Sequence, residues 1–202
     1  MANRVLLLFA HPNQKHSRLN VKMFQHAQAV QGITCVDLYA LYPDHRIDVD
    51  AQQTLLLEHD IVLLQFPFYW YSTPSILKEW QDLVLEYGFA YGHEGKALLD
   101  KKFVCALTAG GKDSAYIADG INQHPISDFL LPLKQTSKLC SMVWLPHFQI
   151  TNARSFDAKH KVAEVIAQWQ QFLEYLVNTE DFSPLDNSTP INGQIIKEHN
   201  ND

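Results

Sequence analysis

The sequence predicts a single α/β domain in which five parallel strands form a sheet that helices cover on both faces. Short apolar runs alternate with amphipathic segments along most of the chain, which is typical of strand–helix–strand units. The apolar runs are nearly continuous, as expected of strands buried on both faces. The chain has 202 residues, 47% of them apolar and 19% charged. This length and composition suffice for one well-packed core.

The predicted elements of the first half follow the hydrophobic pattern. The first helix has apolar residues at helical spacing from Leu19 to Val30 and ends at Gly32, a residue type that often terminates helices. The third strand is apolar except for Gln65, and the helix after it has Pro74 in its first turn. In order, we expect a strand over residues 4–10, a helix over 17–31, a strand over 33–38, a helix over 50–59, a strand over 61–66 and a helix over 73–87.

The second half of the chain continues the alternation. Pro132 lies inside one helical segment and should kink or split that helix. In order, we expect a strand over residues 102–108, a helix over 126–139, a strand over 142–145 and a long helix over 157–177. Beyond about residue 178 the sequence becomes polar and rich in asparagine. Residues 1–180 are therefore expected to form the domain, and residues 181–202 a loose polar tail.

Several functional classes are disfavoured by composition and by missing motifs. The net charge is −6 and no dense basic run occurs, so nucleic acid is not expected as a partner. No apolar run approaches the ~20 residues that span a bilayer. The first run is also too short for a signal peptide. We therefore expect a cytoplasmic protein, held peripherally at the membrane only through a partner. The histidines and cysteines show no metal-binding spacing, so no metal site is predicted.

Three loops that follow predicted strands carry groups suited to ligand binding. The first contains His11 and Ser17 at the start of a helix, where unpaired N–H groups favour a phosphate. The second is an aromatic run at residues 67–71, which can stack on a planar ring. The third contains Gly110 and Gly111, which allow close approach of the backbone to a ligand. Ligands of parallel sheets bind at the carboxyl ends of strands, so the loops together indicate a flat aromatic cofactor with a phosphate tail.

Each loop also has a simpler interpretation. Ser17 can be an ordinary helix cap next to an exposed His11. The aromatic run can form a dimer interface, and the two glycines can form a tight turn without a ligand. Tyr116 is either a hydrogen-bond donor in the site or a packed aromatic residue. The first loop lacks the glycines of the common nucleotide-binding phosphate loops.

The chain resembles the flavodoxin-like NAD(P)H:quinone oxidoreductases from about residue 5 to residue 145. The resemblance is carried by the segments LLLFAHP, QFPFYWYSTPSILKEW and LTAGG. It is closest to the ancillary subunits of glutathione-gated potassium efflux systems. Their pattern recurs in DLYALYPDHRIDVD, FPFYWYSTPSILKEWQDLVLEYGFAYG and SAYIADGINQHPISDFLLPLKQ.

The resemblance implies a flavodoxin-like fold, non-covalently bound FMN, NADH or NADPH as co-substrate, a quinone or similar acceptor and a homodimer. Tyr116 is the candidate catalytic residue. The resemblance implies phosphate contacts at His11 and Ser17 with Leu19 and Asn20 nearby, ring contacts at Pro67, Phe68, Tyr69, Trp70 and Tyr71, and further contacts at Thr108, Gly110, Gly111 and Tyr116.

Two positions differ from the family's reductases. Ala109 replaces the second threonine of the common Thr-Thr-Gly-Gly sequence. Asn122 stands where those reductases have a histidine six residues beyond the tyrosine, and His124 follows two residues later. The alternative function is therefore a regulatory ancillary subunit of a membrane potassium–proton antiporter with weak or vestigial redox activity. A one-electron flavodoxin is disfavoured because the characteristic phosphate loop of flavodoxins is missing.

Overall fold

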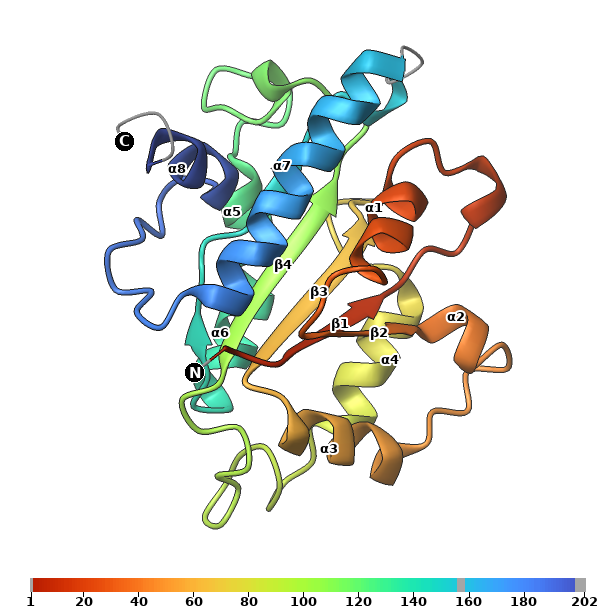
Figure 1. Cartoon of the computed structure of the whole chain (residues 1–202). Coiled ribbons are helices and arrows are strands. Elements are labelled where there is room, and N and C mark those ends of the chain that lie inside the picture. Colours follow the sequence, from red (N-terminus) through yellow and green to blue (C-terminus); the bar gives the residue numbers. More distant parts are fainter. Residues whose placement is uncertain (1, 156–158, 199–202) are drawn as a thin grey trace.

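The computed structural model describes residues 2–155 and 159–198 of the chain (Figure 1). A parallel sheet of order β2-β1-β3-β4-β5 forms its centre, and β6 also pairs with β4. The strands are β1 (Val5–Phe9), β2 (Ile33–Asp37), β3 (Ile61–Pro67), β4 (Lys102–Thr108), β5 (Val143–Trp144) and β6 (Phe148–Ile150). The predicted parallel sheet with helices on both faces is confirmed.

The fifth position of the sheet is divided between two short strands. β5 pairs with the beginning of β4, at Lys102 and Phe103. β6 pairs with the end of β4, from Ala106 to Thr108. The sequence predicted one strand over residues 142–145 and missed β6. The loop that follows β6 consequently lies at the same edge of the sheet as the three loops predicted to bind a ligand.

Helices cover the two faces of the sheet, and each face has its own buried cluster. On one face lie α1, α7 and α8; Figure 1 shows α7 crossing over β4. The other face is covered by α2 to α6. The helices are α1 (Asn20–Ala27), α2 (Leu38–Leu41), α3 (Val49–Glu58), α4 (Ser75–Val84), α5 (Ile126–Phe129), α6 (Leu131–Leu139), α7 (Lys159–Asn178) and α8 (Ile191–Glu198).

Several helix boundaries differ from those expected. The first helix is shorter, because a 3₁₀ turn, Gln14–His16, and an extended Ser17 precede it. The predicted helix over residues 126–139 is split at Leu130, and Pro132 lies in the first turn of α6, as the proline suggested. Residues 157 and 158, the predicted start of the last long helix, lie outside the described residues. None of the described helices combines the length and apolar character needed to cross a bilayer.

The described part of the segment after α7, residues 179–198, is packed against the domain through α8, unlike the loose tail expected from its composition. Ile191 and Ile195 of α8 are buried with the residues of α7. The amide of Ile191 also donates a hydrogen bond to the His147 carbonyl, at 2.9 Å. A few apolar residues at helical spacing are therefore enough to anchor a mostly polar segment.

Candidate functional site

Two adjoining cavities lie where the carboxyl ends of β1, β3 and β4 meet. The small cavity has a volume of about 330 Å³, and the aromatic cavity a volume of about 460 Å³. Both volumes are within the range of small-molecule sites, roughly 300–1,000 Å³. Four residues line both cavities, so the cavities meet at Phe68, Tyr69, Gly110 and Arg154.

Every predicted site residue lines at least one of these cavities. The small cavity is lined by His11, Ser17, Leu19, Asn20, Pro67, Phe68, Tyr69, Thr108 and Gly110. The aromatic cavity is lined by Phe68, Tyr69, Trp70, Tyr71, Gly110, Gly111 and Tyr116.

His11 is placed by the end of β1 and is almost fully buried. The backbone amide of Asn13 donates to its Nδ1 atom at 3.2 Å, so the hydrogen of the neutral ring is assigned to Nε2. Burial lowers the pKa of His11 from its usual value, against smaller opposing effects from a backbone hydrogen bond and from Asp37. The ring is therefore a neutral donor beside the small cavity at physiological pH.

The side chain of Ser17 forms a hydrogen bond with the first turn of α1. Its Oγ atom accepts a hydrogen bond from the amide of Val21 in the first turn at 3.1 Å, while Leu19 occupies the N-cap position of α1. The hydroxyl hydrogen of Ser17 is not used by that bond. The start of α1 thus presents a hydroxyl donor and the positive end of a helix dipole to the small cavity, an arrangement that favours an anion.

A buried polar chain ties the three loops together beneath the small cavity. The Nε2 atom of Gln65 donates to the backbone and side-chain oxygens of Asn20, at 2.8 and 2.9 Å. The Nδ2 atom of Asn20 donates to Oγ1 of Thr108 at 2.9 Å. All three residues are buried. Gln65, the one polar residue of the third predicted strand, therefore anchors Asn20, whose side chain links α1 to the end of β4.

The aromatic loop contains a strained tight turn. Trp70 and Tyr71 have φ values of 50° and 62°, and the amide of Ser72 donates to the Tyr69 carbonyl at 3.0 Å. Non-glycine residues rarely adopt this left-handed region, and strained backbone concentrates at functional sites. The turn leaves Trp70 93% exposed while Phe68 stays buried. The aromatic run is thus divided between the core and the wall of the cavity.

Aromatic contacts hold this wall in place. The ring of Phe68 lies edge-on to Tyr71 and Tyr116, with centroids 6.3 and 6.1 Å apart. Tyr71 stacks on Phe129 of α5 at 5.1 Å. The hydroxyl of Tyr71 donates to Oδ1 of Asn122 at 3.2 Å. The rings therefore form a supported surface against which a planar ligand can lie.

The glycine loop leaves space that larger residues would fill. A Cβ atom at position 111 would lie 3.1 Å from Cε2 of Tyr116 and 3.3 Å from its hydroxyl oxygen. Within the described residues, the N–H groups of Gly110 and Gly111 donate no hydrogen bond to the protein. This backbone can approach a ring closely and offer two donors to it.

The observed cavities fit the flavin nucleotide that the sequence resemblance implied. A phosphate needs donors and a positive potential, and the small cavity has both. A planar ring needs an aromatic wall and a stretch of backbone without side chains that it can approach, and both line the aromatic cavity. The cavities join at Gly110, so one molecule can extend through both of them.

Sequence reasoning missed Arg154, which lines both cavities from the 3₁₀ turn after β6. The omission follows directly from the missed strand. The short alternating run Phe148–Ile150, followed by the polar residues of 151–155, is the signal that could have revealed it. His124 is not among the lining residues; its Nδ1 atom pairs with Asp128 at 3.0 Å, while Asn122 lines the aromatic cavity.

Comparisons with known proteins agree with the fold. A family model described as flavodoxin-like fold matches residues 3–173. The glutathione-regulated potassium-efflux system ancillary protein KefG of Pectobacterium atrosepticum is 42% identical over 168 residues, which cover 82% of this chain and 92% of that protein.

Two solved structures extend the comparison. General stress protein 14 from Treponema denticola, solved in complex with FMN, is 36% identical with a TM-score of 0.80, over 86% of this chain and 99% of that chain. An NADPH-quinone reductase from P. pentosaceus is 26% identical with a TM-score of 0.75, over 84% of this chain and 97% of that chain.

Proposed function

The chain belongs to the flavodoxin-like fold family, and we propose that it is an FMN-dependent NAD(P)H oxidoreductase that reduces a quinone or a similar acceptor. The observation that carries this proposal is the junction of a polar, anion-favouring cavity with an aromatic cavity at the carboxyl edge of the sheet. The FMN complex of the Treponema denticola protein and the quinone reductase from P. pentosaceus support it.

In this proposal the small cavity holds the phosphate of FMN. The Nε2–H of His11 and the hydroxyl of Ser17 donate to phosphate oxygens, and the backbone at Leu19 and Asn20 contributes the helix N-terminus. The side chain of Asn20 is already bonded to Gln65 and Thr108. Its role is therefore to position the first loop.

The aromatic cavity holds the flavin ring. Phe68, Tyr69, Trp70 and Tyr71 line it together with Gly110 and Gly111, while Pro67 and Thr108 line the adjoining small cavity. The N–H groups of the two glycines donate no hydrogen bond to the described residues and are available to the polar end of the ring. Cofactor affinity therefore depends on both stacking and backbone donors, and no covalent attachment is required.

Bound FMN supplies the capacity to accept and return a hydride. NADH or NADPH and the acceptor use the same open cavity in turn. Burial and the neighbouring Tyr71 raise the pKa of Tyr116, with Arg154 acting against them. The Tyr116 hydroxyl therefore keeps its hydrogen at neutral pH and donates it toward negative charge that develops beside Gly111.

A direct test is titration of the purified protein with FMN, followed by quenching of flavin fluorescence. We expect saturable binding, then oxidation of NADH or NADPH that depends on an added quinone. The absorbance of the flavin should bleach on addition of the reduced nicotinamide and return with the quinone. Absence of quenching with excess FMN would contradict the proposal.

A second candidate is a regulatory ancillary subunit of a membrane potassium–proton antiporter with weak or vestigial redox activity. The specific observation in its favour is the 42% identity to KefG, and Asn122 in place of the reductases' histidine is compatible with it. Potassium efflux from vesicles that contain such an antiporter distinguishes the two functions. Protein without flavin that still raises efflux favours the regulator, whereas fast quinone-dependent oxidation of NAD(P)H favours the enzyme.

We further propose a homodimer in the cytoplasm, which the antiporter would recruit to the inner face of the membrane. Trp70 and Ile121 line the aromatic cavity and are 93% and 89% exposed, so a second subunit can cover them. Sedimentation of the wild-type protein and of Trp70→Ser tests the dimer. A monomeric wild-type protein would contradict it.

A further inference from the structure

Arg154 stands at the junction of the two cavities. A Cβ atom at position 110 would lie 2.9 Å from Nε of Arg154, 3.3 Å from its Cδ and 3.4 Å from its Cγ. The side chain therefore runs along the bare backbone of Gly110. It reaches this place only because the residue at position 110 has no side chain.

The turn that carries Arg154 is fastened to two of the cofactor loops. The amide of Asn152 donates to the Gly111 carbonyl at 2.6 Å, and the amide of Ala153 donates to the Ala109 carbonyl at 2.9 Å. From the first loop, Nη1 of Arg18 donates to the carbonyl of Arg154 at 3.0 Å. The position of Arg154 is thus set by backbone contacts of its own loop, so the side chain is not needed to hold that loop.

The guanidinium group of Arg154 forms no hydrogen bond and no ion pair with the described residues. Its positive charge nevertheless acts on residues of the cavity. Burial raises the pKa values of Tyr69 and Tyr116, and the charge of Arg154 partly offsets that rise. An arginine whose donors have no partner among the described residues, beside a cavity that favours an anion, is suited to charge-assisted hydrogen bonding with a ligand.

We propose that Arg154 pairs with an anionic group of the bound flavin nucleotide and acts as a cofactor-binding residue. This inference rests on the proposed function. Two parts of the same nucleotide have the required chemistry: the phosphate in the small cavity, and the pyrimidine end of the ring in the aromatic cavity once it is reduced. The guanidinium lies between the two cavities and can reach either part.

The test compares wild type with Arg154→Gln and Arg154→Lys. Each protein is titrated with FMN and with riboflavin, which lacks the phosphate, and the midpoint potential of bound FMN is measured against a reference dye. Lys112→Gln is the matched control, because it removes a positive charge next to the glycine loop from a residue that lines neither cavity. Thermal unfolding of each variant verifies the fold.

If the phosphate is the partner, Arg154→Gln weakens FMN binding by roughly tenfold to a hundredfold and leaves riboflavin binding unchanged. If the reduced ring is the partner, binding of oxidised FMN is retained. The midpoint potential then falls by about 30 mV for each tenfold loss of affinity for the reduced form. Arg154→Lys recovers part of either effect.

The inference is overturned if Arg154→Gln matches wild type in FMN affinity and in potential, or if Lys112→Gln causes the same changes. A wild-type protein that binds no FMN overturns the proposed function, and this inference with it. The two failures are therefore distinguishable by the wild-type titration alone.

Discussion

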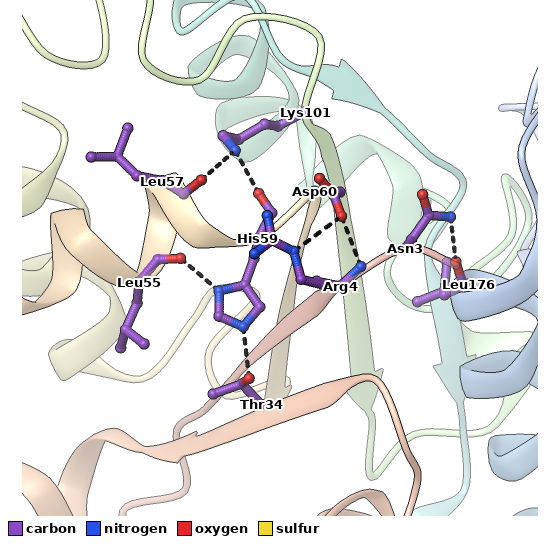
Figure 2. Close-up of polar contacts among 9 residues, drawn as sticks. All are labelled: Asn3, Arg4, Thr34, Leu55, Leu57, His59, Asp60, Lys101 and Leu176. Atoms are coloured by element: carbon purple, nitrogen blue, oxygen red, sulfur yellow. Dashed lines mark hydrogen bonds and ion pairs between the residues drawn. The ribbon is translucent and has the colours of Figure 1, made fainter. Parts of the chain in front are cut away.

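The amino-terminal and carboxyl-terminal edges of the central sheet use their polar residues in different ways. At the amino-terminal edge, polar side chains are bonded to the protein itself, as Figure 2 shows. At the carboxyl-terminal edge, Arg154 and the amides of Gly110 and Gly111 have no such partner among the described residues. The polar side chains of the amino-terminal edge therefore contribute to stability, whereas donors at the carboxyl-terminal edge remain available to a ligand.

The amino-terminal edge is interlocked by side-chain contacts to several elements. The His59 ring lies 2.6 Å from both the Leu55 carbonyl and Oγ1 of Thr34. The amide of Arg4 donates to Asp60 at 2.8 Å, and Lys101 reaches the carbonyl of His59 (Figure 2). These bonds connect β1, β2, β3 and the end of α3, so each satisfied group stabilises the fold.

The carboxyl-terminal edge instead has donors without a partner among the described residues, next to the strained turn of the aromatic loop. Trp70 and Tyr71 adopt left-handed backbone conformations, each of which costs on the order of 1–3 kcal/mol for a non-glycine residue. Substitutions at this edge are therefore expected to alter ligand binding more than stability. Substitutions at the other edge should have the opposite effect.

The largest expected effect is on FMN binding, from Gly111→Val. The new side chain would begin 3.1 Å from Tyr116 and extend into the aromatic cavity. We expect FMN affinity to fall by roughly a hundredfold, with a modest change in melting temperature. Fluorescence titration and thermal unfolding measure both quantities. Gly193→Ala is the control, because a Cβ atom there meets nothing within 4 Å. An unchanged FMN affinity would show that the two glycines form a structural turn and do not contact the cofactor.

At the amino-terminal edge, His59→Ala should destabilise the protein without affecting the cofactor. The Leu55 carbonyl and the Thr34 hydroxyl would lose their partner, at a cost of about 2–3 kcal/mol in free energy of unfolding. Urea unfolding measures this loss, and His93→Ala at an exposed position is the control. A large loss of FMN affinity in a folded His59→Ala protein would contradict the proposed division between the two edges.

Two buried glutamines differ in their position relative to the cavities. Gln65→Leu breaks the chain from Gln65 through Asn20 to Thr108 and should weaken FMN binding by about tenfold. Gln52→Leu removes equally buried contacts to Tyr42 and Trp80, away from both cavities, and should lower only stability. Each variant is titrated with FMN and unfolded in urea. Equal losses of FMN affinity would show that Gln65 acts through general stability.

A smaller effect is expected from Tyr116→Phe, which keeps the ring and removes the hydroxyl. We expect FMN to remain bound and the oxidoreductase rate to fall by roughly tenfold. This is less than the loss typical of a well-placed lone donor, because the amides of Gly110 and Gly111 share the role. Stopped-flow experiments should follow reduction by NAD(P)H and reoxidation by a quinone separately. If both half-reactions of the variant proceed at the wild-type rates, Tyr116 serves only in packing.

The smallest effect concerns pH. Burial lowers the pKa values of His11 and His147 from the ordinary 6.5 in the folded protein. The unfolded chain therefore binds more protons below about pH 6.5, and the free energy of unfolding should decrease as the pH falls through that value. His11→Gln and His147→Gln should each flatten part of this dependence, measured by urea unfolding between pH 7.5 and 5. If the free energy of unfolding still decreases with falling pH in both variants, groups other than His11 and His147 cause the decrease.

The α/β architecture and most of the candidate site can be predicted from the sequence. Nearly continuous apolar runs identified β1, β3 and β4, since a strand buried on both faces needs apolar residues throughout. The loops with His11, with residues 67–71 and with Gly110 could then be brought together, because the carboxyl ends of parallel strands share one edge. Gln65 was recognised only as an exception within its strand.

Features that depend on partners distant in the sequence could not be predicted in this way and are visible only in the folded chain. β5 has two residues and β6 three, and both are strands because β4 supplies their hydrogen bonds. Arg154 joins the site through this pairing, and the partner of Gln65 lies 45 residues away in the sequence. α8 is docked by Ile191 and Ile195 against α7 and β6. Hydrophobic periodicity predicts only local secondary structure. These contacts instead depend on residues that the complete fold brings together.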